Sequence, residues 1–277
     1  MKLTIVGMDF VGLVNAVGFA EKGHQVFCLD SDKKKIAALR KNEVTINSEY
    51  KLADILKKND FNIRFTSEYR DAIYDSSVIM LAIEPIEKDS GKIDLSPLYQ
   101  CAKECCRFIN RDVTVIIRTT VPVGTNRDLK DFMMTVTERK YNIDVVSNPE
   151  FLSQGSAVKD MLSPSRIVVG VSTKRSQAVM KELYKDFESP ILFVSPESAE
   201  LIKYASNSYL AVKLSYINEI ADLCDKVGAD IQEVSFGIGL DPRIGTKYLS
   251  SGVGFGGPAL TLDTKVMQQL AIDKEVK

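Results

Sequence analysis

The sequence predicts an α/β protein in which a Rossmann-type, doubly wound parallel sheet is followed by an α-helical domain with one long central helix. Three observations predict this fold. Short apolar runs rich in β-branched residues alternate with segments of helical period through the first part of the 277-residue chain, as in parallel sheets covered by helices on both faces. A glycine-containing turn follows the first run. A helical period of about 30 residues begins at Ser198.

The first βαβ unit lies at the start of the chain. Lys2–Val6 is a short apolar run suited to a buried strand, and helical spacing extends over residues 11–22. Gly23 is a natural stop for that helix, and Gln25–Leu29 is the second strand. The unit spans about 30 residues, the length that a strand, a crossover helix and a parallel strand require.

The same alternation predicts the elements that follow. Strands are expected at residues 77–83, 113–117, 145–146 and 163–171, and helices at 95–110, 198–227 and 230–239.

The helix at 198–227 is longer than one small core needs. We expect it to span its domain and to offer a surface for a second copy of the chain, as a homodimer. The predicted domains are a dinucleotide-binding domain at 1–197 and a helical, dimerising domain at 198–277.

Composition excludes several functions. Lys plus Arg number 36 and Asp plus Glu 37, so the chain lacks the positive field that gathers nucleic acid. Gly7 interrupts the first apolar run too early for a signal peptide, and no run of 18 apolar residues predicts a membrane span. We therefore expect a cytoplasmic protein without nucleic-acid or membrane partners.

The five cysteines and the single histidine suggest structural roles. The cysteines are odd in number and lack paired metal-ligand spacing, so we expect reduced, mostly buried thiols and no metal site. His24 follows the helix stop at Gly23, which predicts a surface turn residue and not a general base.

The turn Gly7-Met-Asp-Phe-Val-Gly12 lies between the first strand and helix, and Asp30 ends the next strand 18 residues after Gly12. This context is typical of a dinucleotide site, in which glycines admit the pyrophosphate and the acid binds a ribose hydroxyl. Asp9 occupies the position of the second glycine. Like-charge repulsion at about 4 Å costs roughly 1 to 4 kcal/mol, which predicts weakened dinucleotide binding.

Six ordered segments carry a resemblance that covers nearly the whole chain. Together they resemble the UDP-glucose/GDP-mannose dehydrogenase family, most closely its members that act on UDP-glucose. The segments are 6–13 (VGMDFVGL), 118–125 (RTTVPVGT), 147–152 (SNPEFL), 199–204 (AELIKY) with Asn207, 241–245 (DPRIG) and 254–263 (GFGGPALTLD).

The resemblance implies an NAD-dependent, two-step oxidation of a UDP-sugar C6 alcohol to the carboxylate, through an aldehyde and an enzyme thioester. The catalytic positions it implies are Thr120, Glu150, Lys203, Asn207 and Asp263. The cofactor-binding positions are Gly7, Phe10, Val11, Gly12, Asp30, Lys35 and Thr120. The substrate-binding positions are Phe151, Leu152, Lys203, Asn207, Arg243, Phe255 and Gly256, with Arg243 reaching into the partner subunit's site.

The chain departs from the family pattern at four positions. Ala259 stands where the family has its nucleophilic cysteine, and a methyl group cannot attack a carbonyl. Glu84 replaces a cofactor-facing threonine and, with Asp9, brings negative charge toward an anionic cofactor. Leu262 replaces a lysine, and Gln154 replaces a glutamate. The sequence therefore predicts an impaired dehydrogenase.

Two other interpretations remain open. In the first, the chain is a nucleotide-sugar-binding or dimeric interaction protein without turnover, which Ala259 favours. In the second, it is a 3-hydroxyacid or 6-phosphogluconate type of dehydrogenase, against which the Phe-Gly-Gly turn and the segment 241–245 count. Residue by residue, Lys203 and Arg243 could also be ordinary surface charges. Family members continue into a further UDP-binding domain, which we expect to lie outside this chain.

Overall fold

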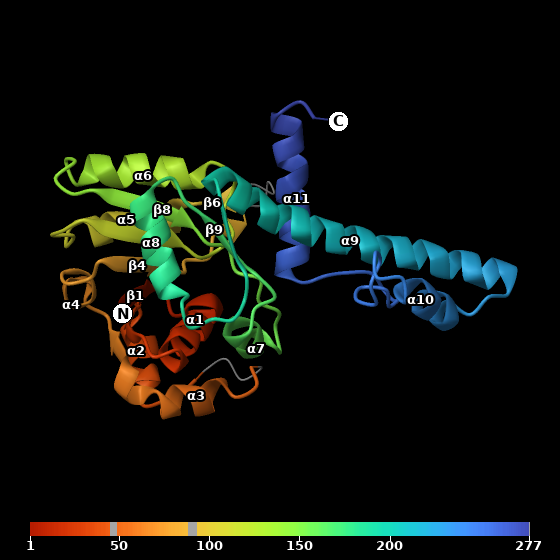
Figure 1. The fold of residues 1–277 in the computed structure, drawn as a ribbon, viewed down its shortest axis with the longest axis horizontal. Helices are drawn as coiled ribbons and strands as arrows, with labels where there is room; N and C mark the ends of the chain where they lie inside the picture. Colours follow the sequence, from red (N-terminus) through yellow and green to blue (C-terminus); the bar gives the residue numbers. More distant parts are fainter. Residues whose placement is uncertain (45–48, 88–92, 277) are drawn as a thin grey trace. The chain divides into compact units, whose positions relative to one another are not determined.

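The computed structural model describes residues 1–44, 49–87 and 93–276 (Figure 1). The chain divides into two compact units. Unit 1 comprises Met1–Ile86 and Ile93–Leu201, and unit 2 comprises Glu87–Lys92 and Ile202–Lys277. Each unit is described by itself below.

Unit 1 is built on an eight-stranded sheet with the order β10-β9-β8-β7-β4-β1-β2-β3. The pairings from β3 to β8 are parallel, β9 meets β8 in antiparallel fashion at a single bridge, and β10 runs parallel to β9. The strands are β1 Lys2–Val6, β2 Gln25–Leu29, β3 Ile63–Thr66, β4 Val78–Leu81, β7 Val113–Ile117, β8 Ile143–Ser147, β9 Ile167–Gly170 and β10 Ile191–Val194. Strands β5 Ile86–Glu87 and β6 Ile93–Asp94 form a separate two-stranded sheet.

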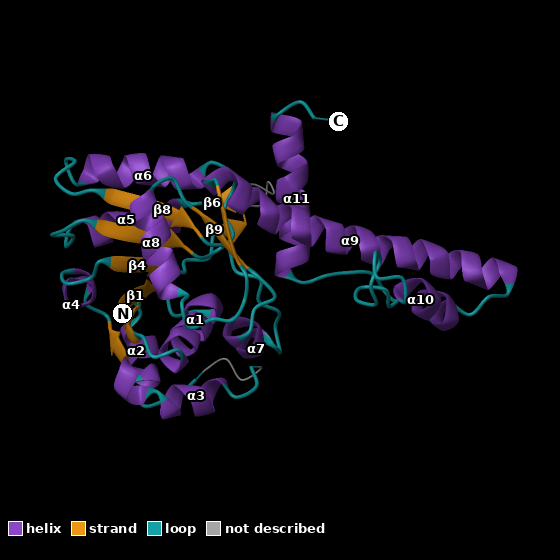
Figure 2. Cartoon of the chain, in the orientation of Figure 1, coloured by secondary structure: helices purple, strands orange, loops and turns teal. Residues whose placement is uncertain are grey.

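Helices cover both faces of the large sheet (Figure 2). They are α1 Phe10–Glu21, α2 Lys33–Leu39, α3 Leu52–Lys58, α4 Tyr69–Ile73, α5 Ser96–Cys106, α6 Thr125–Val136, α7 Ala157–Leu162 and α8 Lys174–Leu183, with the short 3-10 turn Asp60–Asn62 before β3. Successive strand residues point to opposite faces, so Met80 joins the apolar cluster under α1 while Ile79 and Leu81 join the cluster under α5.

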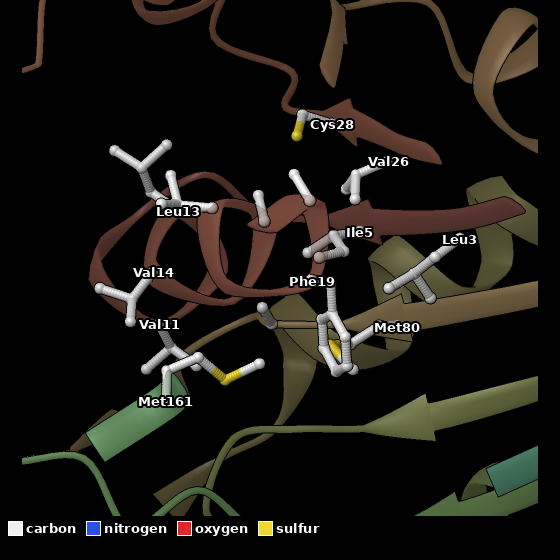
Figure 3. Close-up of a cluster of buried hydrophobic side chains, with 14 of the residues drawn as sticks. Leu3, Ile5, Val11, Leu13, Val14, Phe19, Val26, Cys28, Met80 and Met161 are labelled. Carbon is white, nitrogen blue, oxygen red and sulfur yellow. The ribbon is translucent and has the colours of Figure 1, made fainter. Parts of the chain in front are cut away.

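Helix α1 is buried along nearly its whole length. Figure 3 shows its side chains between the strands β1 and β2 and Met161 of α7. The absence of a side chain at Gly18 allows this approach, since a Cβ there would lie 2.3 Å from Met161 Cγ. The turns at both ends of α1 are thereby held by the core.

The doubly wound sheet and the long helix confirm the predicted fold class. The strands predicted at 77–83 and 163–171 are shorter in the structure, with β4 at Val78–Leu81 and β9 at Ile167–Gly170. The helix predicted to reach residue 110 ends at Cys106. The sequence did not predict the short helices of five to seven residues, the longer helices α6, α8 and α11, or the strands β3, β5, β6 and β10.

The prediction that His24 is a surface turn residue is wrong. Its side chain is buried, packs edge-on to Phe19 and lies 3.2 Å from the amino group of Met1 through Nδ1. Burial lowers the pKa of His24 below its ordinary value. The prediction that the cysteines are mostly buried is confirmed, since all five are buried and none forms a disulfide among the described residues.

Unit 2 contains most of α9 Pro196–Val227, with α10 Ile231–Gly239 and α11 Pro258–Asp273. Helix α9 begins two residues before the predicted start at Ser198 and ends at the predicted residue, Val227. No helix within the described residues is both long and apolar enough to cross a bilayer.

Two side chains of α9 fasten the loops of unit 2. Lys213 Nζ donates to the carbonyl oxygens of Ile244 at 3.0 Å and Lys247 at 2.6 Å. Asn218 Oδ1 accepts a hydrogen bond from the backbone N–H of Gly252 at 2.8 Å. The long helix is therefore a scaffold for the loops that carry Arg243 and the glycine cluster.

Candidate functional site

The turn between β1 and α1 requires glycine at two positions. Gly7 has a φ of +92°, and a Cβ there would lie 2.6 Å from the carbonyl oxygen of Ala82. A Cβ at Gly12 would lie 1.7 Å from the carbonyl oxygen of Gly7. Asp9 lies between them in extended backbone, with φ −80° and ψ −163°, a conformation that does not need glycine. The turn thus keeps its shape although its second glycine is missing.

Asp30 lies at the carboxyl end of β2, beside this turn. Its Oδ2 accepts the backbone N–H of Met8 at 2.8 Å, and its Oδ1 accepts the backbone N–H of Asp32 at 2.9 Å. The residue is 8% exposed. This is the position from which an acid reads the ribose of a dinucleotide, as the spacing predicts.

Lys35 joins the two acids of the turn. Its Nζ lies 2.6 Å from Asp9 Oδ1 and 2.9 Å from Asp30 Oδ2. Burial disfavours the charged form of Lys35, but the hydrogen bonds to Asp9 and Asp30 outweigh it and raise its pKa. The repulsion expected from Asp9 is therefore partly offset by Lys35, a residue that the resemblance implies at the cofactor site but whose contact with Asp9 was not predicted.

Glu84 adds a further negative charge close to the turn. Partial burial raises the pKa of Glu84, and the carboxylates of Asp9 and Glu150 raise it further. Glu150 itself accepts a hydrogen bond from the backbone N–H of Leu152. Three acids from three separate segments thus influence one another within unit 1.

Beneath these acids lies a buried polar network that the sequence did not predict. Arg118, at the end of β7, donates through Nε to Asn15 Oδ1 at 2.9 Å and through Nη1 to Asn148 Oδ1 at 3.0 Å. Tyr184 donates to the same Asn148 oxygen. Because α1, the end of β7 and the segment after β8 all contact one guanidinium, this network fixes the loops that carry the candidate site.

Two threonines follow Arg118 in the sequence. Thr119 is buried, and Thr120 is half-buried.

Glu200, in the first turns of α9, connects three of the six ordered segments. Its carboxylate accepts from the backbone N–H groups of Gly124 at 2.6 Å and Asn126 at 2.9 Å, and from Ser147 Oγ at 3.2 Å. Burial raises the pKa of Glu200, and these hydrogen bonds oppose the shift. Glu200 is not among the predicted site positions, although an acid flanked by Ala199 and Leu201 at the start of an apolar helix is a sequence signal for a buried, paired carboxylate.

In unit 2, the expected catalytic residues of α9 and α11 lie together. Asn207 Nδ2 donates to Asp263 Oδ2 at 2.6 Å, and Asp263 is 4% exposed. Lys203, one helical turn before Asn207, is 4% exposed, so it is not an ordinary surface lysine. Ala259, one turn before Asp263 on α11, is exposed.

The remaining predicted positions of unit 2 are more open. Arg243 is exposed and paired with Asp241, with Nη2 2.6 Å from Oδ2. Gly256 is exposed, and Phe255 is 37% exposed at an open hollow of about 370 Å³. Ala211 and Ser215 of α9 and Thr264 of α11 line the same hollow.

The candidate residues thus fall into two sets. Unit 1 carries the residues of the dinucleotide turn together with Thr120, Glu150, Phe151 and Leu152, and the last three lie half-buried on the loop after β8. In this unit Phe10 is half-buried and Val11 is buried at the start of α1. Gln154 is exposed on the same loop after β8, and Leu262 is half-buried in α11 of unit 2.

The chain matches the models of two domains of one protein family. Residues 1–188 match the NAD binding domain of the UDP-glucose/GDP-mannose dehydrogenase family. Residues 197–277 match the central domain of that family.

Similar proteins extend beyond the length of this chain. It is 39% identical over 272 residues to UDP-glucose 6-dehydrogenase TuaD of Bacillus subtilis, covering 98% of this chain and 59% of that protein. It is 41% identical over 283 residues to UDP-glucose 6-dehydrogenase of Rhizobium meliloti, covering 99% of this chain and 64% of that protein. The chain therefore spans about three fifths of the length of these curated relatives.

Solved structures show the same arrangement within the matched region. A UDP-glucose dehydrogenase from Pyrobaculum islandicum superposes with a TM-score of 0.94 at 32% identity, covering 99% of this chain and 65% of that one. A GDP-mannose dehydrogenase from Pseudomonas aeruginosa, solved as a ternary complex, gives a TM-score of 0.83 at 28% identity and covers 100% of this chain and 66% of that one.

Proposed function

Because this chain belongs to the UDP-glucose/GDP-mannose dehydrogenase family, we propose that it binds NAD through unit 1 and a UDP-sugar, UDP-glucose foremost, through the family's substrate positions. We further propose that it is an impaired UDP-glucose 6-dehydrogenase. The observation that carries this proposal is the pair of buried residues Lys203 and Asp263 in unit 2, with Asn207 hydrogen-bonded to Asp263, while an alanine stands at the nucleophile position.

The residues of the β1–α1 turn fit a dinucleotide. The backbone around Gly7 and Gly12 leaves no space for a side chain at either position. The carboxylate of Asp30 accepts a hydrogen bond from the N–H of Met8. We assign the backbone of Phe10 and Val11 at the start of α1 to the pyrophosphate, and Asp30, with Lys35, to the ribose. When bound, NAD takes up the two electrons and the hydrogen removed from the sugar C6.

Polar residues at the family's catalytic positions are assigned the remaining chemistry. The Lys203 ammonium stabilises negative charge that develops on the C6 oxygen. Asp263 is held in one orientation by Asn207 and, like Glu150, orders a water molecule or accepts a proton. Thr120 and the loop residues Phe151 and Leu152 are assigned to positioning, as are Arg243, Phe255 and Gly256 on the sugar-nucleotide side.

Ala259 limits the reaction that these residues can complete. Oxidation of the C6 alcohol to the aldehyde consumes one NAD and releases one NADH and one proton, with no covalent bond to the protein. The second oxidation of the family runs through a thioester, which needs a thiol that Ala259 lacks. We therefore propose that turnover stops largely at the aldehyde. Separately from this effect on turnover, Asp9 and Glu84 weaken NAD binding, because both place negative charge near the pyrophosphate.

A second candidate function is a nucleotide-sugar-binding, dimeric interaction protein without turnover. The apolar stripe on α9, formed by Tyr209, Val212, Tyr216 and Leu223, favours this role because it supports dimer formation without using the chemistry. Both candidates predict a homodimer through residues 198–227.

The test combines binding with product counting. Thermal shifts with NAD, NADH and UDP-glucose report which ligands bind the folded chain. NADH formed per UDP-glucose is then measured for the chain and for Ala259→Cys. We expect at most one NADH per sugar for the chain and a rise toward two for the variant. Micromolar NAD binding with two NADH per sugar in the unaltered chain would contradict impairment. A shift with UDP-glucose and none with NAD would favour the binding protein.

A further inference from the structure

The Lys35 ammonium lies between two carboxylates of the dinucleotide turn. Its Nζ is 2.6 Å from Asp9 Oδ1 and 2.9 Å from Asp30 Oδ2, and the Lys35 side chain is 25% exposed. Asp9, in contrast, has a side chain that is 62% exposed. One ammonium between two carboxylates leaves this group of three residues with a net charge of −1.

The position of Lys35 bears on whether the site binds NAD or NADP. In Rossmann-type domains the acid at the end of the second strand binds the ribose 2′-hydroxyl, and a basic residue nearby accommodates the 2′-phosphate of NADP. Lys35 lies in the first turn of α2, and its Nζ is 2.9 Å from that acid. Among the described residues, Lys35 is the basic side chain that lies within hydrogen-bond distance of Asp30. Its ammonium also donates a hydrogen bond to Asp9.

Asp30 itself is nearly saturated with donors. A carboxylate offers about four lone-pair positions, and Asp30 already accepts from the N–H of Met8, the N–H of Asp32 and Lys35. A ribose hydroxyl can donate to the remaining position. A phosphate dianion can donate nothing, so its binding would depend on the Lys35 ammonium, whose charge the carboxylates of Asp9 and Asp30 already counter.

We propose that Asp9 is a specificity-determining residue that selects NAD over NADP by holding Lys35 away from a 2′-phosphate. The substitution at the second glycine thus acts at the adenosine ribose as well as at the pyrophosphate. Repulsion at the pyrophosphate weakens both dinucleotides equally, whereas the sequestered Lys35 penalises only the one with the 2′-phosphate. The inference rests on the proposed binding of NAD in unit 1.

The test measures dissociation constants by calorimetry for NAD and NADP, and for the fragments 5′-AMP and 2′,5′-ADP, which lack the pyrophosphate. The variants are Asp9→Asn, Lys35→Met and the double variant. Asp9→Asn keeps the size and backbone of the turn and removes one charge. We expect it to shift the ratio of NADP to NAD affinity by about tenfold toward NADP, with the same direction for the two fragments. The shift should vanish in the Lys35→Met background.

Glu84→Gln is the matched control, because Glu84 also faces Asp9 electrostatically but makes no hydrogen bond with Lys35 among the described contacts. It should strengthen NAD and NADP by the same factor. Equal gains for both dinucleotides in Asp9→Asn, or a gain that survives Lys35→Met, would overturn the inference while NAD binding stands. If folded protein, verified by circular dichroism, binds neither dinucleotide in any variant, the proposed function and this inference fail together.

Discussion

Glu84 links the charge of the candidate cofactor site to pH. Its raised pKa means that it takes up a proton above the ordinary carboxyl range near 4.5, so the site loses one negative charge as pH falls through that raised value. Affinity for anionic NAD should therefore increase as pH is lowered, before the ordinary carboxylates titrate. NAD titrations between about pH 5 and 8 test this. In Glu84→Gln we expect tighter binding at neutral pH and a nearly flat pH profile, and parallel profiles for both proteins would contradict the assignment.

The start of α1 requires glycine at position 12, because the backbone of the preceding turn occupies the space that a side chain would need. A methyl group at this position would lie 1.7 Å from the carbonyl oxygen of Gly7, a backbone contact that no side-chain rotation relieves. We expect Gly12→Ala to destabilise the chain by roughly 2 to 4 kcal/mol, measured by denaturant unfolding. Gly237→Ala in α10 is the control, because that position has nothing within 4 Å. It should be neutral or stabilising by up to about 1 kcal/mol, and equal losses for both variants would refute the steric argument.

At the scale of residues, the sequence predicts what local spacing determines. Gly7, Gly12 and Asp30 are identified by their places relative to one strand and one helix, and the structure puts them at one turn. The partner of Asp9 is 26 residues away, so its identity depends on where α2 begins in space. His24 fails for the same reason, because residues distant in sequence cover a turn that local signals place in solvent.

At the scale of elements, Glu200 shows how a helix is attached to loops from other parts of the chain. Glu200→Gln replaces one acceptor oxygen by an NH₂ group, which then faces a backbone N–H of Gly124 or Asn126. We expect a loss of about 1 to 3 kcal/mol in the free energy of unfolding, with faster hydrogen exchange at the start of α6. Glu197→Gln, on the exposed side of the same helix turn, should change little. An equal, small effect of both variants would show that Glu200 is not a structural connection.

The elements divide by how much sequence pattern they contain. The β-branched strands and α9, with its 32 residues, have a periodicity that identifies them. Helices of five to seven residues such as α4 and α7 are too short for a period to emerge, so tertiary contacts decide them. Strand β10 escaped prediction because it lies at the sheet edge and is only partly buried, which blurs its apolar alternation.

At the scale of the whole molecule, the ordered segments predict the family more securely than they predict the completed reaction. The spacing of six segments is a property of the fold and is retained. Turnover depends on individual atoms, and Ala259 and Asp9 change those atoms without changing the fold. This is why the fold and the family could be predicted, while the charge balance at the turn required three-dimensional contacts.

The surface of α9 carries the prediction that concerns assembly. Tyr209, Val212, Tyr216 and Leu223 recur at helical spacing with exposed fractions of 62%, 61%, 51% and 55%, and a stripe this apolar on a long helix is typical of an isologous interface. A stable dimer needs about 800 Å² of buried surface per partner, which a helix of this length can supply. We expect a dimer at micromolar concentration in sedimentation velocity.

The double variant Val212→Glu with Tyr216→Glu places like charges opposite their own copies and should convert the dimer to a monomer without loss of helix content. Leu192→Glu changes a residue on β10 that is 49% exposed, and it should leave the dimer intact because that strand lies in unit 1, away from the stripe in sequence and element. A monomeric starting protein, or dissociation by Leu192→Glu and not by the double variant, would place the interface elsewhere. An isologous interface places the same residue on both sides of the two-fold axis. Each introduced glutamate on α9 should therefore repel the copy of itself in the partner, and this repulsion should weaken as ionic strength rises.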